Sequence, residues 1–281
     1  MFKGRVDMKS QIEMALKMEF NPVAVIWSDK LPENAMRFKE GRWGCVMWLF
    51  ANAAKGKTAA FDRKTYGCWG GGVGLGFGNT YQYFPGGQTC FEYFLSNGNK
   101  NYEVGKEVAA RLENLARKDF VEDFLEGERY VKTPEKVKNF LDQLPMMDVP
   151  TKYVIFKPLQ DVDWNLEKPK VIVFPANPHE LAALVVLANF GRDSFENVIF
   201  PWGAGCQTIG ILAYKEIESM PQRAVVGLSD ISARKNIRNY LGDNIFTFTV
   251  PTEMFMEMES NVSESFLLRP TWLSLNRLSS K

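Results

Sequence analysis

The chain has 281 residues, of which 46% are hydrophobic and 13% aromatic, and its 34 basic side chains balance 33 acidic ones. This composition is typical of a globular protein with one large or two moderate hydrophobic cores. Without a sustained basic run, the chain lacks the electrostatic footprint of a protein that binds nucleic acid. No stretch reaches the roughly 18 apolar residues of a membrane span.

The compartment is predicted from the N-terminus and the cysteines. Residues 1–17 mix charges with isolated apolar residues and lack the apolar segment of a secretory signal. Four cysteines are too few and too scattered for a disulfide framework. We therefore predict a cytoplasmic protein whose cysteines stay free or bind metal, with neither nucleic acid nor a membrane as partner. Its seven tryptophans and 21 phenylalanines are compatible with a homo-oligomer.

The first elements in chain order are helices and short strands. An amphipathic pattern predicts a helix over 11–18, and an apolar run predicts a strand over 22–27. A buried helix is expected over 45–55 and a brief strand over 58–61. Residues 67–87 contain nine glycines, and this density predicts a wrapped loop instead of a regular element.

The remaining chain divides into a helical part and an alternating part. Residues 91–144 are charged and helical in pattern, with Thr133 as a cap before Pro134. From residue 152 on, predicted strands and helices alternate: strands 153–156, 170–174, 197–200, 224–228 and 245–250, and helices 178–189, 207–217, near 232, 253–259 and 264–277. Such alternation is typical of parallel sheets covered by helices.

We therefore predict an α/β or α+β fold with mixed or parallel sheets covered by helices. No flexible linker interrupts the sequence, which favours a single compact domain over 1–281. The change of pattern near residue 150 would divide it into halves 1–150 and 151–281. A weak internal echo supports two related halves, because Gly44-Cys45 and Gly205-Cys206 each precede a helix and then a strand. The two cysteines would then converge at equivalent helix N-termini across a pseudo-twofold axis.

Cys45, Cys68 and Cys206 each follow a glycine directly. A thiolate that meets a ligand, cluster or substrate at close range often has glycine beside it, whereas a cysteine that only fills core space does not need one. The chain has no Cys-x-x-Cys pair and a single histidine, His179, so zinc-finger, ferredoxin and multi-histidine spacings are absent. Three cysteines from distant segments suit an iron–sulfur cluster whose fourth iron is open as a Lewis acid, with Cys90 as a spare or fourth ligand. The alternative is that these cysteines are small buried residues at tight helix starts.

At these residues the chain resembles a known family. The stretch Gly-Cys-Trp-Gly-Gly-Gly-Val-Gly-Leu-Gly-Phe at 67–77, the segment 174–188 with its Asn-Pro-His-Glu core, and Gly205-Cys206 before a helix are similar to the domain of unknown function 169 family. The resemblance runs from about Pro22 to the C-terminal region. It implies a prokaryotic protein of archaea or anaerobic bacteria with no established reaction, in which an oxygen-sensitive cluster, [4Fe–4S], has a place.

The glycine run and the acidic and basic residues after a later strand complete the predicted site. Four glycines are expected to line the cofactor, since backbone amides can approach cluster sulfurs there: Gly70, Gly71, Gly72 and Gly74. The run lacks the Gly-Lys-Ser/Thr end of a phosphate loop. Arg234 lies just past a buried strand, where open α/β sheets bind ligands, and would orient a small anionic substrate. The alternative is a surface salt bridge between Asp230 and Arg234.

Two other functions compete with a cysteine-bound iron–sulfur or other metal cofactor. One is a metal-free small-molecule binding protein whose glycine-rich loop closes over its ligand. The other is a cysteine-nucleophile enzyme with Cys68 or Cys206 as nucleophile and His179 as base, which requires a thiol of depressed pKa. The residues do not name the substrate, the reaction or a redox partner.

Overall fold

The computed structural model of the chain describes residues 9–113 and 118–278. Within these residues the chain forms two compact units. Unit 1 comprises the described residues up to Phe77 and those from Asp148 on, and unit 2 comprises Gly78–Met147.

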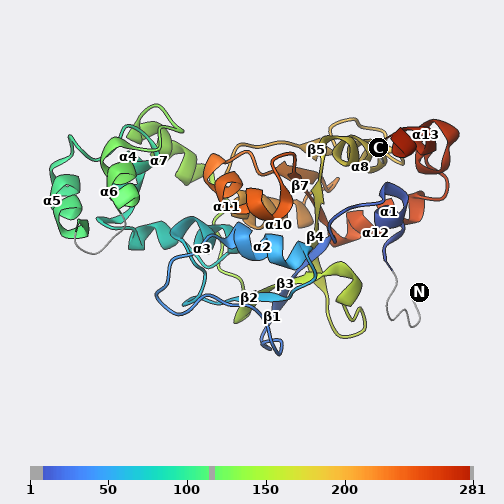
Figure 1. Cartoon of the computed structure of the whole chain (residues 1–281), viewed down its shortest axis with the longest axis horizontal. Helices are drawn as coiled ribbons and strands as arrows, with labels where there is room; N and C mark the ends of the chain where they lie inside the picture. Colours follow the sequence, from blue (N-terminus) through green and yellow to red (C-terminus); the bar gives the residue numbers. More distant parts are fainter. Residues whose placement is uncertain (1–8, 114–117, 279–281) are drawn as a thin grey trace. The chain divides into compact units, whose positions relative to one another are not determined.

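A mixed sheet of seven strands is the centre of unit 1 (Figure 1), with the order β2-β3-β1-β4-β7-β6-β5. Only β5 and β6 pair in parallel, and the other neighbours are antiparallel. The strands are β1 (Val23–Ser28), β2 (Ala59–Phe61), β3 (Tyr153–Pro158), β4 (Pro169–Ala176), β5 (Val198–Ile199), β6 (Ala224–Gly227) and β7 (Phe246–Pro251). The fold is therefore α+β, which confirms a mixed sheet covered by helices.

The sheet is less parallel than the alternation of strands and helices after residue 152 indicates. β1 and β2 run in the same direction, but β3 pairs between them and is antiparallel to both. In the same way, β7 separates β4 from β6. The sequence pattern correctly predicts that helices connect strands of the same direction. It does not show that a later strand, antiparallel to both, lies between them.

Helices cover both faces of the sheet. On one face lie α2 (Val46–Ala54), α9 (Gly205–Ile209) and α10 (Ile211–Ile217), with α3 (Trp69–Leu75) against α9 and α11 (Ile231–Leu241) against α2. On the other face lie α1 (Gln11–Leu16), α8 (Pro178–Asn189), α12 (Thr252–Asn261), η3 (Phe266–Leu268) and α13 (Pro270–Leu278). Alternation along each strand produces the two faces: Phe248 packs in the core with α8 and α12, whereas its neighbour Thr247 faces α9.

Segments from opposite ends of the sequence lie side by side at α1, as the dark blue and red helices of Figure 1 show. The Glu259 carboxylate accepts hydrogen bonds from the amides of Gln11 and Ile12 at 3.0 and 3.2 Å. The indole of Trp272 lies 3.4 Å from the carbonyl of Ala15 and donates to it. A carboxylate at the first turn of α1 satisfies amides that have no partner within the helix.

Unit 2 is helical, as the sequence predicts. It contains η1 (Thr80–Tyr83), α4 (Gly87–Leu95), α5 (Glu103–Leu112), α6 (Lys118–Glu126; no structure is described for residues 114–117) and α7 (Pro134–Gln143). Thr133 caps α7 by accepting the amide hydrogen of Lys136. Its core is aromatic: Phe84 packs edge-on against Phe91 and stacks on the fully buried Phe124.

The topology of unit 1 contains an internal repeat. The strands β1, β2 and β3 occupy the order β2-β3-β1, and β4, β6 and β7 occupy the mirrored order β4-β7-β6. Paired strands of the two triplets point in opposite directions, as a twofold axis perpendicular to the sheet between β1 and β4 requires. The same rotation relates α2 to α9–α10 and α3 to α11. It also relates the contact of α3 with α9 to the contact of α11 with α2.

Candidate functional site

Cys45 stands at the N-terminus of α2. It is the N-cap residue, with an extended backbone, and it is partly buried. Burial, together with the neighbouring Cys68, raises the pKa of its thiol to about 12. Although 22 residues separate Cys45 from Cys68 in sequence, the glycines that precede them lie against each other.

Cys68 has the same position on α3. Its Sγ accepts the amide hydrogen of Gly71 at 3.3 Å, so a sulfur takes the place of the usual cap oxygen. Burial raises the pKa of this thiol to about 11, while the amide of Gly71 lowers it. The preceding Gly67 has φ +81° and lies against the carbonyl of Gly44, which brings the two glycine-cysteine segments into direct contact.

Cys206 lies in the first turn of α9 and is 6% exposed. Its Sγ donates to the carbonyl of Gly70, in the first turn of α3, at 3.1 Å. Burial is the main cause that raises the pKa of its thiol well above the ordinary value, and the negative charges of Cys68, Asp230 and Cys45 contribute further. The structure therefore brings together the three cysteines singled out by the sequence.

The glycine-rich stretch is not a loop where it adjoins these cysteines. Residues 69–75 form the helix α3, so the prediction of a wrapped loop over 67–87 is wrong at this point. A Cβ at Gly71 would lie 2.6 Å from Cγ2 of Val46, and one at Gly74 would lie 2.7 Å from the carbonyl carbon of Cys206. The glycines are needed because α3 packs backbone to backbone against its neighbours, a demand that overrides their low helix propensity. A role of Gly70, Gly71, Gly72 and Gly74 in lining a cofactor stays a prediction.

A fourth helix N-terminus closes the site. Asp230 is the N-cap residue of α11, and its Oδ1 accepts the amide hydrogen of Ala233. Its Oδ2 accepts the amide hydrogen of Gly205, the residue before Cys206. The site thus consists of three thiols and one carboxylate at the N-termini of α2, α3, α9 and α11. Helix N-termini carry positive partial charge, so this arrangement favours a negatively charged occupant.

The other predicted residues lie elsewhere. His179 stacks on Trp272 at 4.4 Å between ring centroids, on the α8 face of the sheet, whereas Cys206 lies on the opposite face. The geometry therefore gives no support to His179 as a base for Cys68 or Cys206. Cys90 is fully buried in unit 2, where it packs against Gly86.

Arg234 points along α11 away from its N-terminus. Its Nη1 donates to the carbonyl of Asp243 at 3.0 Å, and its guanidinium lies over the ring of Phe246. The hydrogen-bond partners of Asp230 are the amides of Gly205 and Ala233 and the hydroxyl of Ser232, and among the described residues no ion pair with Arg234 is found. A role of Arg234 in orienting substrate stays a prediction.

Among the residues that the structure describes, no group of three or more histidine, cysteine, aspartate or glutamate side chains is placed so that it could hold a metal ion. One tetrahedral ion with metal–sulfur bonds of about 2.3 Å requires sulfurs within about 4 Å of one another. A cluster binds each thiolate to a different iron and therefore suits sulfurs that are spread more widely.

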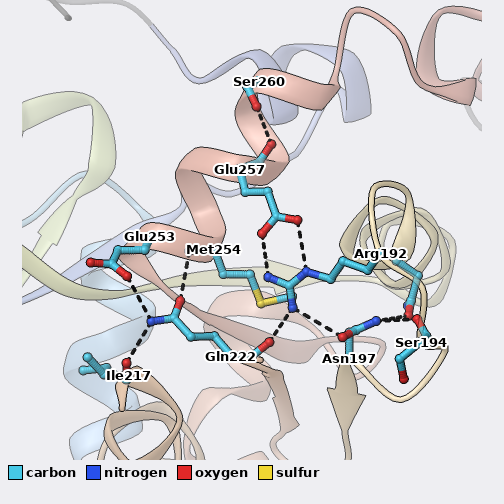
Figure 2. Close-up of polar contacts among 10 residues, drawn as sticks. Arg192, Ser194, Asn197, Ile217, Gln222, Glu253, Met254, Glu257 and Ser260 are labelled. Carbon is cyan, nitrogen blue, oxygen red and sulfur yellow. Dashed lines mark hydrogen bonds and ion pairs between the residues drawn. The ribbon is translucent and has the colours of Figure 1, made fainter. Parts of the chain in front are cut away.

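A cavity of about 530 Å³ lies beside Arg192, on another part of unit 1. Figure 2 shows that its guanidinium is held by Glu257, with Nη2 2.6 Å from Oε2 and Nε 3.0 Å from Oε1, and by Asn197 and the carbonyl of Gln222. Gln222 in turn accepts the amide hydrogen of Met254. This network joins α12 to the segments before β5 and β6. No sequence pattern distinguishes Arg192, and its guanidinium already has protein acceptors.

The fold and site define a class of protein: an α+β protein with a covered mixed sheet and a group of thiols at helix N-termini. The chain belongs to the domain of unknown function 169 family (DUF169), described as an uncharacterised ArCR, which matches residues 11–261. This confirms the resemblance noted at the glycine-cysteine segments. Comparisons with curated proteins and with solved structures found no match. None of the described helices is long and apolar enough to cross a lipid bilayer.

Proposed function

We propose that Cys45, Cys68 and Cys206 bind an iron–sulfur cluster, [4Fe–4S], in a cytoplasmic protein. The observation that carries the proposal is the convergence of three thiols from three distant segments at the N-termini of α2, α3 and α9. Thiolates are soft ligands that select iron–sulfur clusters, zinc and copper(I) over harder ions. A cluster would bind each thiolate through a different iron, so it does not require all three sulfurs within bonding distance of one ion.

The electrostatics of the site support a cluster as its occupant. Burial raises the pKa of all three thiols, so a thiolate needs compensating positive charge. Iron supplies that charge, and metal binding releases the thiol protons. A cluster with thiolate ligands is an anion as a whole, and the N-termini of the surrounding helices stabilise it. Amides that point at sulfur, such as that of Gly71, also tune the potential of a cluster.

The reaction class follows from the number of cysteines. Three thiolates leave one iron of a four-iron cluster without a cysteine, and such an iron can act as a Lewis acid toward a small anionic molecule. The residues of this chain would bind that molecule near the N-terminus of α11, where the helix dipole favours an anion. In the structure the guanidinium of Arg234 lies over Phe246 and binds the carbonyl of Asp243, so orienting that molecule would require Arg234 to move toward the N-terminus of α11.

Anaerobic reconstitution of matched variants tests the ligand set. Cys45→Ser, Cys68→Ser and Cys206→Ser are each expected to lose most of the bound iron and acid-labile sulfide, together with the visible absorption. Cys90→Ala is the matched control, because Cys90 packs in unit 2 against Gly86, and it should keep the wild-type content. Far-ultraviolet circular dichroism checks that each variant is folded. Full iron and sulfide content in any of the three serine variants would remove that cysteine from the ligand set.

A further inference from the structure

Asp230 occupies the position that corresponds to Cys68 in the internal repeat. The twofold rotation that relates β2 to β6 also relates α3 to α11. Cys68 is the N-cap of α3, and Asp230 is the N-cap of α11. Each side chain binds the amide three residues ahead: the sulfur binds that of Gly71, and the carboxylate binds that of Ala233. The two residues therefore have the same local role but different chemistry.

The carboxylate of Asp230 borders the segments that carry the three thiols. Its Oδ2 accepts the amide hydrogen of Gly205, so it is attached to the first turn of the helix that carries Cys206. The Sγ of Cys206 in turn donates to the carbonyl of Gly70, two residues after Cys68. The glycines that precede Cys45 and Cys68 lie against each other.

One oxygen of Asp230 retains capacity for another bond. Oδ1 accepts hydrogen bonds from the amide of Ala233 and the hydroxyl of Ser232, while Oδ2 accepts one from the amide of Gly205. A carboxylate has about four lone-pair positions, two on each oxygen. The hydrogen bonds found among the described residues use three of them, and the fourth belongs to Oδ2, the oxygen bound to the amide of Gly205.

From this geometry we infer that Asp230 is the fourth protein ligand of the site, bound through Oδ2 to the iron that the three cysteines leave without one. The inference rests on the proposed function. A carboxylate oxygen is a harder ligand than a thiolate, so this iron is held less firmly than the other three. An incoming anion can displace such a ligand more easily than a thiolate, which makes the α11 end of the site the place of substrate access.

The test oxidises the reconstituted protein under controlled conditions and measures how fast one iron is lost. Electron paramagnetic resonance and iron analysis monitor the loss. Asp230→Asn is the informative variant, because asparagine still caps a helix but its amide oxygen is a poor ligand. We expect this variant to convert to a three-iron form at least about tenfold faster than wild type. Asp230→Cys should convert more slowly than wild type, because it places a second Cys68-like thiol at the N-terminus of α11.

Ser232→Ala is the matched control, since it removes the hydroxyl that binds Oδ1 and leaves Oδ2 untouched. It should convert at the wild-type rate. Equal rates for wild type, Asp230→Asn and Asp230→Cys, with four irons bound in each, would show that Asp230 only caps α11 and would overturn the inference alone. A wild-type protein without iron and sulfide would instead overturn the proposed function, and the inference with it.

Discussion

The thiols of the site are buried beside one another, and this neighbourhood suppresses their reactivity in the absence of metal. Burial raises the pKa of Cys45 to about 12 and that of Cys68 to about 11. At pH 7 a thiol of pKa about 11 is ionised in only about one molecule in ten thousand. A nucleophilic cysteine requires the opposite environment, with a depressed pKa.

Metal-free protein should therefore react slowly with iodoacetamide at pH 7 at Cys45, Cys68 and Cys206. Mass spectrometry of the alkylated peptides measures the rate at each position, and the same protein in denaturant provides the rate of exposed thiols. We expect each site to react at least about a hundredfold more slowly in the folded chain. Alkylation of one of them at or above the rate in denaturant would favour a thiol enzyme.

Glu180 allows a pH-dependent prediction that is independent of the cysteine site. Burial raises the pKa of its carboxyl above the ordinary value, while the amide of Asn177 opposes the change. A carboxyl whose pKa is raised by folding favours the folded state below its unfolded pKa of 4.5. That contribution is lost as the pH rises through the folded pKa. The ionised Glu180 is thus a cost to stability at neutral pH.

Glu180→Gln should become more stable relative to wild type as the pH rises from 4 to 7. Glutamine stays neutral and can still accept the amide hydrogen of Asn177, so the capping box is kept. Urea unfolding of both proteins at the two pH values measures the difference in the free energy of unfolding. A wild type that gains stability over the variant between pH 4 and pH 7 would refute the assigned cause.

At the scale of elements, the close contact of α3 with α9 depends on glycine. A Cβ at Gly74 would lie 2.7 and 2.9 Å from the carbonyl carbon and oxygen of Cys206, atoms of a helix backbone that cannot turn aside. Gly74→Ala should therefore lower the free energy of unfolding by about 1 to 3 kcal/mol and displace Cys206. Thermal and urea unfolding measure the loss.

Gly191→Ala is the control for this substitution. Gly191 is exposed, and its added Cβ would meet only the ends of two side chains, Nδ2 of Asn261 at 3.2 Å and Oε1 of Glu257 at 3.9 Å. Its effect should stay within about 0.5 kcal/mol. If the two alanine variants were equally stable, the packing account of the glycine run would be wrong.

The elements show where sequence reasoning succeeds and where it stops. The strand β1 and the helix α8 are set by local signals: an apolar run for Val23–Ser28, and the Asn177 cap with Pro178 for the helix. The helix α3 carries no such signal, because three successive glycines, each costing about 1 kcal/mol relative to alanine, indicate a loop. Its stability comes from contacts with Cys206 and Val46 that lie far away in sequence.

At the scale of the whole molecule, the sheet order explains why the site could be predicted only in part. The glycine before each cysteine singled out Cys45, Cys68 and Cys206. Asp230 belongs to the site because α11 is the counterpart of α3 in the internal repeat. That repeat exists because β3 and β7 each lie between two earlier strands. No local pattern encodes such an insertion. The sequence therefore predicts the thiols as ligands, and it indicates Asp230 only through its position after a buried strand, not as a partner of the cysteines.

The most direct test of the account is the iron and acid-labile sulfide content of the wild-type chain, purified under strict exclusion of oxygen. The account predicts about four irons and four sulfides per chain, with broad visible absorption that bleaches on reduction. A colourless, folded protein without iron or sulfide, which also fails to take them up on anaerobic reconstitution, would contradict it.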